Sequence, residues 1–225
     1  MNCMKKIILA CIIIILVITI TGCINNKKKV IFFGDSITRF GVEPGGYIDL
    51  LNKRLAVRDD AANFELTGAG ISGNKVYDLY LRLEEDILAK NPDIVIIWIG
   101  VNDVWHKISM GTGTDADKFE KFYTAIIKKM QKKNITVILA TPAAIGEKYD
   151  NTNQQDGDLN LYSNIILNLA AQYKCGLCDL RKIFMDYEAV NNKENKQIGI
   201  LTSDGVHLNS KGNELVADAL IGFLK

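Results

Sequence analysis

The most constraining feature of this chain is the apolar run at residues 93–100, "DIVIIWIG", near the middle of the sequence. Its β-branched residues favour a strand, and no charged residue interrupts it between Asp93 and Gly100. A continuous rather than alternating apolar pattern is typical of a strand that is buried on both faces, as in a parallel sheet covered by helices on each side. The run therefore predicts the central strand of such a sheet.

Four more segments are predicted as strands, and helical patterns separate them, as in β/α proteins. The other strands are expected at "KVIFFGD" (29–35), "NFELTGAG" (63–70), "NITVILATP" (134–142) and "CGLCDL" (175–180). Helices are expected at 47–55, 76–88, 119–130 and 159–173, and polar loops at 146–158 and 191–197. Together these elements predict one α/β domain with a doubly wound, five-stranded parallel sheet.

A last helix is expected after Asn209 or Ser210, either of which suits an N-cap. Its apolar residues fall on one face at helical spacing. They are Leu215, Val216, Ala219, Leu220, Phe223 and Leu224.

Residues 1–22 have the composition of a secretory signal rather than of a folded domain. Lys5 and Lys6 precede an apolar run of 14 residues that ends at Ile20, and a small residue, Gly22, precedes Cys23. A membrane-spanning helix needs about 20 apolar residues, so this run is short for one. The alternative to a cleaved signal is an uncleaved signal anchor, and both place the folded domain outside the cytoplasm.

The tetrapeptide "ITGC" at 20–23 is similar to the lipobox of bacterial lipoproteins. In those proteins the chain is cut before the cysteine, whose thiol then carries lipid. We therefore expect a lipid on Cys23, a tether at 23–28, and a folded domain at 29–225 anchored to the bacterial cell membrane.

Charge and cysteine content exclude several classes of function. The chain carries 27 basic and 26 acidic side chains, without a basic stripe of the kind that binds nucleic acid. Cys175 and Cys178, spaced as "CGLC", could form a local disulfide outside the cell or remain as buried thiols. A zinc site needs about four ligands, and two cysteines with two distant histidines make a poor set.

Chemistry in a doubly wound sheet is expected at the carboxyl ends of its strands. Ser36 directly follows the first predicted strand, and a serine needs a base to become a nucleophile. His207 is one of only two histidines, and Asp204, three residues earlier, could fix its tautomer and orientation. Taken singly, Ser36 could be a helix N-cap and Asp204 could close an Asx turn.

An oxyanion formed by such an attack needs preorganised donors. The backbone N–H groups of Ser36 and Gly73 and the side-chain amide of Asn102 are expected at the same end of the sheet, although "ND" also makes ordinary turns. The surrounding "GAGISG" at 68–73 fits a dinucleotide fingerprint but follows the second strand rather than the first. We therefore attribute these glycines to close approach of the backbone.

In this order, these segments resemble the four blocks of the SGNH hydrolases, also called GDSL-type lipases and esterases. The matching segments are "GDSIT" with Ser36, "ISGN" with Gly73, "GVND" with Asn102 and "DGVHL" with Asp204 and His207; Ile37 stands where leucine is common. The blocks span residues 34–208, nearly the whole expected domain.

The resemblance implies a three-layer α/β/α sandwich of the flavodoxin-like SGNH type, without metal or organic cofactor. It implies a serine esterase in which Ser36 is the nucleophile, His207 the base and Asp204 its orienting carboxylate. Ser36, Gly73 and Asn102 would form the oxyanion hole.

The substrate is less constrained than the chemistry. Trp105 and His106 follow the third block, where a tryptophan could stack on a sugar ring or simply pack beneath the loop, and His106 could touch substrate. The loop at 146–158 lacks the apolar residues that a lipid-binding lid needs. We therefore expect a short acyl ester, such as acetyl, on a carbohydrate or similar polar molecule. The alternatives are a lysophospholipase or thioesterase, an O-acyltransferase, and an inert glycan-binding domain.

Overall fold

The computed structural model describes residues 27–58 and 63–224, so the predicted signal and Cys23 lie outside the described residues. Five strands form one sheet in the order β2-β1-β3-β4-β5, with every neighbouring pair parallel. They are β1 (Lys28–Gly34), β2 (Phe64–Gly70), β3 (Ile94–Trp98), β4 (Thr136–Ala140) and β5 (Gly176–Cys178). The five predicted strands and the doubly wound parallel sheet are confirmed.

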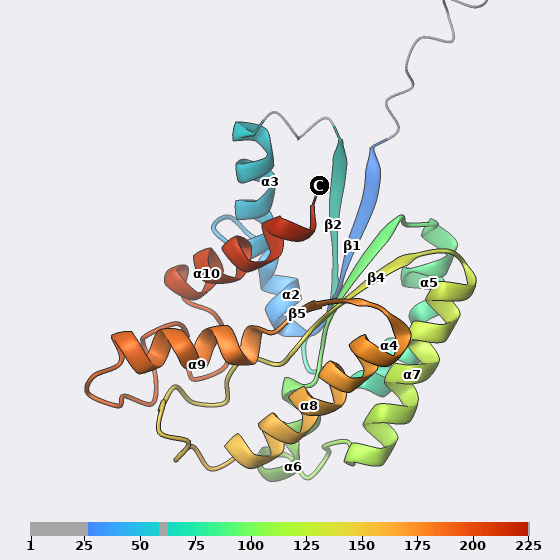
Figure 1. Cartoon of the computed structure of the whole chain (residues 1–225). Coiled ribbons are helices and arrows are strands. Elements are labelled where there is room, and N and C mark those ends of the chain that lie inside the picture. Colours follow the sequence, from blue (N-terminus) through green and yellow to red (C-terminus); the bar gives the residue numbers. More distant parts are fainter. Residues whose placement is uncertain (1–26, 59–62, 225) are drawn as a thin grey trace, which may run out of the picture.

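Helices cover both faces of the sheet, which gives the predicted three-layer sandwich (Figure 1). One face packs against α2 (Ser36–Gly41), α3 (Tyr47–Val57), α9 (Leu180–Asn191) and α10 (Ser210–Leu220). The other packs against α4 (Val76–Leu81), α5 (Leu83–Asp86), α6 (Val101–Ser109), α7 (Ala116–Lys132) and α8 (Asp156–Tyr173). Two 3₁₀ turns, η1 (Leu88–Lys90) and η2 (Ile221–Phe223), complete the described elements.

The apolar runs of the strands supply a separate core on each face. In β1, Val30 and Phe32 enter the core beneath α3 and α10, whereas Ile31 and Phe33 enter the core beneath α4 and α7. This alternation follows from the two-residue period of a strand. Burying each such side chain contributes roughly 1.5–3 kcal/mol, so continuous apolar runs fix these strands in the middle of the sandwich.

Four helical segments differ from the sequence prediction. The helix expected at 76–88 is broken at Arg82, whose guanidinium turns back to the carbonyl oxygens of Gly34 (2.9 Å) and Ala69 (3.0 Å). Helices α2, α6 and α9 were not predicted. The first turns of the short helices α2 and α6 contain Ser36 and Asn102, residue types that favour turns when judged locally. The segment "GVNDVWH", expected as a loop, is therefore mostly helix α6.

The C-terminal part of the domain agrees with expectation in most respects. Asn209 is the N-cap of α10, with its side chain accepting from the backbone N–H of Gly212 at 3.0 Å. Helix α8 begins at Asp156, which shortens the polar loop predicted at 146–158.

Cys175 and Cys178 are free thiols, and burial raises their pKa values to about 11 and about 12. Among residues 27–58 and 63–224, no helix is long and apolar enough to cross a membrane.

Candidate active site

Ser36 is positioned by the abrupt passage from β1 into α2. Asp35 caps the helix, its carboxylate accepting from the backbone N–H of Ile37 at 3.0 Å. A side chain at Gly34 would lie 2.5 Å from the carbonyl oxygen of Trp98, so only glycine allows the turn to lie this close to β3. Ser36 is the first residue of α2, so Asp35, and not Ser36, is the N-cap of this helix. The backbone N–H of Ser36 therefore belongs to the N–H groups that a helix leaves without an intrahelical partner.

The structure brings Ser36, His207 and Asp204 into one hydrogen-bonded chain. The Oγ of Ser36 lies 2.9 Å from Nε2 of His207, and Nδ1 of His207 lies 2.7 Å from Oδ2 of Asp204. A carboxylate can only accept, so Nδ1 carries a proton and Nε2 is free to accept from the serine hydroxyl. This is the geometry in which an imidazole activates a serine.

The charge of Asp204 is fixed by its surroundings. Partial burial pushes the pKa of Asp204 upwards, but hydrogen bonds from the His207 ring and from the backbone N–H groups of His207 and Val206 outweigh it. The net result is a pKa below the ordinary aspartate value. The backbone bonds, at 2.8 Å from His207 and 3.0 Å from Val206, close the Asx turn that the sequence offered as the alternative role. Asp204 thus forms the turn with one oxygen and holds the histidine with the other.

The ring of His207 lies between two aromatic side chains. Phe40 and Trp105 approach it edge to face, with ring centroids 5.7 Å and 6.3 Å away. Phe40 comes from α2 and Trp105 from α6, so the His207 ring contacts the elements that follow β1 and β3. Such edge-to-face contacts restrict the ring in addition to the hydrogen bond from Asp204.

The glycine-rich carboxyl end of β2 lies close to helix α2 and to Val42, which follows that helix. A side chain on Gly70 would lie 2.2 Å from the backbone nitrogen of Arg39, and one on Gly68 would lie 2.4 Å from Val42. The backbone N–H of Ile71 donates to Gly34 at 3.2 Å. Gly73 has φ +80°, a conformation that favours glycine. The glycines thus serve close backbone approach, and what they approach is the helix that carries Ser36.

Asn102 reaches the same place from the first turn of α6. It is almost fully buried, and its side-chain Nδ2 donates to the carbonyl oxygen of Asn74 at 3.1 Å. A side-chain amide has two N–H donors, so one remains after this bond is made. Since Asn74 follows Gly73 directly, the bond ties two of the three predicted oxyanion donors to each other.

Ionisable side chains that are buried or half-buried hold the start of α2 and the loop of Gly73 in place. Burial raises the pKa of Asp35 to about 7, and nearby Asp103 raises it further against the hydrogen bond from Ile37. Burial likewise raises the pKa of Asp103 to about 6, opposed by the backbone N–H of Val76. Arg82 donates to the side chain of Asn74 at 2.8 Å while bonding to the ends of β1 and β2. These contacts fix the loop of Gly73 relative to Ser36.

Glu147 is a residue that sequence reasoning missed. Its side chain is fully buried, and its two oxygens accept the backbone N–H groups of Ile200 (2.8 Å), Leu201 (2.5 Å) and Thr202 (2.6 Å). These three residues shortly precede the turn of Asp204 and His207, so Glu147 positions the segment that carries His207. Nothing local in "AIGEKYD" marks this role, because its partners lie more than 50 residues away.

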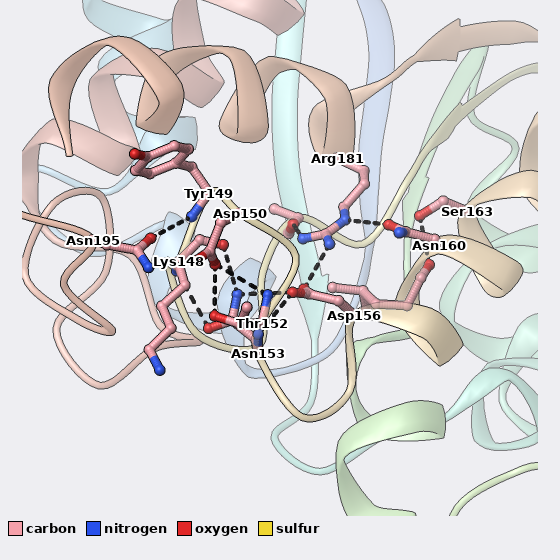
Figure 2. Close-up of polar contacts among 12 residues, drawn as sticks. Lys148, Tyr149, Asp150, Thr152, Asn153, Asp156, Asn160, Ser163, Arg181 and Asn195 are labelled. Atoms are coloured by element: carbon pink, nitrogen blue, oxygen red, sulfur yellow. Dashed lines mark hydrogen bonds and ion pairs between the residues drawn. The ribbon is translucent and has the colours of Figure 1, made fainter. Parts of the chain in front are cut away.

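The segment between β4 and α8 is also held in place rather than left as a free loop (Figure 2). Arg181 and Asp156 form an ion pair of 2.7 Å whose side chains are both almost fully buried. Asp156 also accepts from the backbone and side-chain nitrogens of Asn153, each at 3.0 Å. Further along, Asn195 donates to Asp150 at 2.8 Å and accepts from the backbone of Tyr149. The polar composition predicted a loop here, and tertiary partners order it.

Trp105 and His106 have different surroundings. Trp105 is half-buried and lines a hollow of about 380 Å³ that opens beside Asp204. His106 is buried, and its Nδ1 has no hydrogen-bond partner among the described residues. Burial, and to a smaller extent the charge of Lys75, lowers the pKa of His106. A second hollow, of about 510 Å³, lies on the side of Phe40 and includes His207. Trp98 is part of the core, as expected. The described residues contain no group of three or more His, Cys, Asp or Glu side chains that could hold a metal ion.

Comparison with known proteins agrees with this geometry. Residues 32–215 match the GDSL-like Lipase/Acylhydrolase family. A crystal structure of an acetyl xylan esterase, AlAXEase, is 61% identical, with a TM-score of 0.86; the match covers 88% of this chain and 100% of that one. The acetylxylan esterase of Geobacillus stearothermophilus is 28% identical over 218 residues, 88% of this chain and 94% of its own length. A lipoprotein of Bacillus subtilis, YqeF, is 23% identical over 232 residues, 93% of this chain and 95% of its own.

Proposed function

This chain belongs to the GDSL-like lipase/acylhydrolase family and is a carboxylic ester hydrolase, and from that premise we propose that it removes acetyl groups from xylan or xylo-oligosaccharides. The observation that carries this proposal is the 61% identity to an acetyl xylan esterase across the whole length of that chain. The hydrogen-bonded chain from Ser36 through His207 to Asp204 supports the chemistry.

In the acylation step, Nε2 of His207 takes the proton of the Ser36 hydroxyl while Oγ attacks the acetyl carbon. The attack converts the carbonyl into a tetrahedral oxyanion, and His207 becomes an imidazolium. Asp204, ionised because its pKa is low, stabilises that imidazolium and keeps the ring in place. When the intermediate collapses, His207 returns the proton to the departing sugar oxygen and acetyl remains on Ser36.

The oxyanion is stabilised by donors that exist before the substrate arrives. We assign this role to the backbone N–H groups of Ser36 and Gly73 and to the remaining side-chain N–H of Asn102. The bond from Asn102 to Asn74 and the bonds of Arg82 hold these donors still, so little reorganisation accompanies the reaction.

In the deacylation step, the sugar has left and water attacks the acetyl carbon that Ser36 now carries. His207 takes a proton from the water, the hydroxide adds to the acetyl carbon, and the same donors stabilise the second oxyanion. Collapse breaks the bond to Oγ of Ser36, which takes the proton back from His207, and the released acetic acid loses its own proton to solvent as acetate.

The proposal is tested by measuring acetate release from acetylated xylan beside hydrolysis of 4-nitrophenyl acetate, butyrate and octanoate. We expect acetate release from the polysaccharide and a fall in kcat/KM as the aryl ester lengthens. Ser36→Ala serves as the inactive control. Preference for octanoate without acetate release from xylan would instead indicate a lipase or thioesterase. Transfer of acetyl to an added sugar in preference to water would indicate an acyltransferase.

We further propose that Cys23 carries lipid and holds the domain at the outer face of the cell membrane. The lipobox-like "ITGC" and the likeness to a lipoprotein over 93% of this chain support the anchor. The chain enters the sheet at the amino end of the seven-residue strand β1, and Ser36 lies just beyond its carboxyl end. At roughly 3.3 Å per residue, β1 alone separates the two by about 20 Å. An anchored domain would therefore present Ser36 away from the bilayer.

Mass spectrometry of the native protein tests the anchor. We expect a lipid-modified Cys23 at the N-terminus, and we expect Cys23→Ser to leave the membrane fraction or to remain uncleaved. An unmodified Cys23 at a free N-terminus would refute lipidation without affecting the esterase proposal.

A further inference from the structure

The hollow of about 380 Å³ beside Asp204 has a lining that suits a sugar. It lies between α6, the segment that precedes α8, and the chain from Gln197 to Val206. We propose that this hollow, called here the glutamine hollow after Gln154, Gln155 and Gln197, binds the neutral sugar units adjoining the acetylated one. The inference rests on the proposed deacetylation of xylan and names the surface that selects the glycan.

The chemistry of the lining favours an uncharged, hydroxyl-rich ligand. Gln154 and Gln197 are exposed, and within the described part of the chain their side-chain amides make no hydrogen bond to protein. A side-chain amide both donates and accepts, which suits sugar hydroxyls that do the same. The lining contains no lysine or arginine, and its single charged side chain is Asp204. Neither a phosphate headgroup nor an acidic polysaccharide finds a cation there.

Gln155, unlike its neighbour Gln154, is bonded within the protein. It is buried, and its Nε2 donates to the carbonyl oxygen of Val104 at 2.8 Å. This bond ties the segment before α8 to helix α6, which also carries Trp105. Gln154, the adjacent residue, is therefore held at a fixed place relative to the tryptophan and remains free to meet a ligand.

Trp105 connects the glutamine hollow to the reacting groups. It lines the hollow, and its ring centroid is 6.3 Å from that of His207. An indole offers a broad apolar face on which the C–H face of a sugar ring can lie. A sugar that leaves with the oxygen protonated by His207 is then next to both the aromatic ring and the glutamine amides.

Hydrogen bonds and an ion pair within the protein hold both sides of the glutamine hollow. On one side, the backbone N–H groups of Gly146 and Glu147 donate to the carbonyl oxygens of Gly205 (2.8 Å) and Gln197 (2.9 Å). On the other, the Arg181–Asp156 ion pair and the bonds of Asn153 hold the segment that carries Gln154 (Figure 2). A preformed site loses little conformational entropy on binding, which favours weakly interacting ligands such as neutral sugars.

The larger hollow beside Phe40 is a weaker candidate for the same ligand. Its two asparagines are already used by the fold. Asn209 accepts from Gly212 and donates to Thr202, and Asn213 accepts from Tyr47 and donates to Asn209. By contrast, the side-chain amides of Gln154 and Gln197 make no bond within the described part of the chain, so all their donors and acceptors can meet sugar hydroxyls.

The double variant Gln154→Ala/Gln197→Ala tests the inference, with Gln172→Ala, an exposed glutamine near the end of α8, as the matched control. We measure kcat/KM for acetylated xylotriose and for 4-nitrophenyl acetate, which is too small to fill the hollow. The ratio of the first to the second should fall about tenfold in the double variant, mainly through KM, because two neutral hydrogen bonds are lost. The ratio should not change in Gln172→Ala.

An unchanged ratio in the double variant, while the parent protein deacetylates xylotriose, would overturn the subsite and leave the proposed function standing. Titration of unacetylated xylotriose into Ser36→Ala protein distinguishes the two claims, because it requires no turnover. Binding that the two glutamine substitutions weaken would support the subsite even if the parent released no acetate. If xylotriose did not bind to Ser36→Ala protein that keeps both glutamines, the subsite would be refuted.

Discussion

Two hollows of similar volume lie at opposite ends of the sheet, and only one of them is next to reactive groups. The hollow at the amino ends, about 460 Å³, is lined by the first residues of β1, β3 and β4 and by the loops that precede β3 and β4. The glutamine hollow at the carboxyl ends, about 380 Å³, is next to Asp204. The hollow at the amino ends includes none of Ser36, Asp204 and His207, whereas Asp204 lines the glutamine hollow and His207 lines the hollow of about 510 Å³ beside Phe40. Both hollows that include these side chains lie at the carboxyl ends, so strand direction locates the site.

The two ends also differ in what they bury. At the carboxyl end, Asp35, Asn102 and Asp103 are almost fully buried, and two of them have pKa values raised by burial. At the amino end, the buried residues are apolar, as with Leu88 and Ile94, while Asp93 is exposed. Burying polar groups costs free energy unless they are paired, so this sandwich bears that cost at the end where chemistry occurs.

The largest expected effect comes from removing the nucleophile or the base. Ser36→Ala and His207→Ala should each lower kcat on 4-nitrophenyl acetate by on the order of 10⁴-fold or more. Because the two side chains act together, the double variant should lose little more than either single one. Lys133→Ala, which alters the amino-end hollow, should stay within about twofold of the parent. Circular dichroism melting checks that each variant folds.

The opposite ranking of activity losses would contradict the contrast between the two ends of the sheet. If Lys133→Ala lost activity as severely as His207→Ala while remaining folded, the amino-end hollow would take part in catalysis.

The next largest effect is expected at Asn102. Asn102→Ala removes one oxyanion donor and should lower kcat by about 10²–10³-fold with little change in KM. The bond to Asn74 is lost as well, so thermal melting is measured alongside. A loss confined to KM would assign Asn102 to substrate binding rather than to the oxyanion.

Glu147→Gln should have a smaller effect that acts through position. A glutamine supplies one acceptor oxygen and turns an NH₂ group towards a backbone N–H of residues 200–202, so at least one of three bonds is lost. We expect kcat to fall about 10-fold with KM nearly unchanged, since displacement of the base slows the chemical step. Losing a hydrogen bond to a charged group should also cost about 1.5–3 kcal/mol of stability.

Glu194→Gln, an exposed carboxylate in the neighbouring 191–197 loop, is the matched control for Glu147→Gln. Equal activities of Glu147→Gln and the control would show that the loop of His207 holds its geometry without this carboxylate.

The smallest expected effect is on stability and depends on pH. Burial, reinforced by Glu147, raises the pKa of Glu188 from 4.5 to about 8, so the folded protein keeps this group protonated where the unfolded chain has lost the proton. The parent therefore loses stability through Glu188 as pH rises from about 4.5 to about 8. Glu188→Gln should gain in melting temperature over the parent across that window, by about 2–4 °C for each kcal/mol.

Differential scanning calorimetry at pH 5, 6.5 and 8 measures this gap, which is the difference in melting temperature between Glu188→Gln and the parent. A gap that stays constant over the three values would mean that Glu188 titrates alike in the folded and unfolded protein. Activity on 4-nitrophenyl acetate at a single pH should differ little between Glu188→Gln and the parent, because Glu188 touches neither Ser36 nor His207.

The sequence alone determined the sheet and predicted which side chains would meet at its carboxyl end. Strands buried on both faces must be continuously apolar, so "DIVIIWIG" and its companions are visible without any tertiary information. Asp204 and His207 are three residues apart, so their contact is nearly local, and the topology of a parallel sheet brings Ser36 to the same end.

Only the tertiary structure decided what supports and surrounds those groups. Helix α6 forms although "GVNDVWH" favours a turn, the helix expected at 76–88 breaks where Arg82 reaches two strand ends, and Glu147 meets a segment more than 50 residues away. Arg181 orders the polar segment that carries Gln154 through Asp156. Each of these outcomes depends on hydrogen bonds between distant parts of the chain, whose free energy outweighs local preference once burial has removed water as the competing partner.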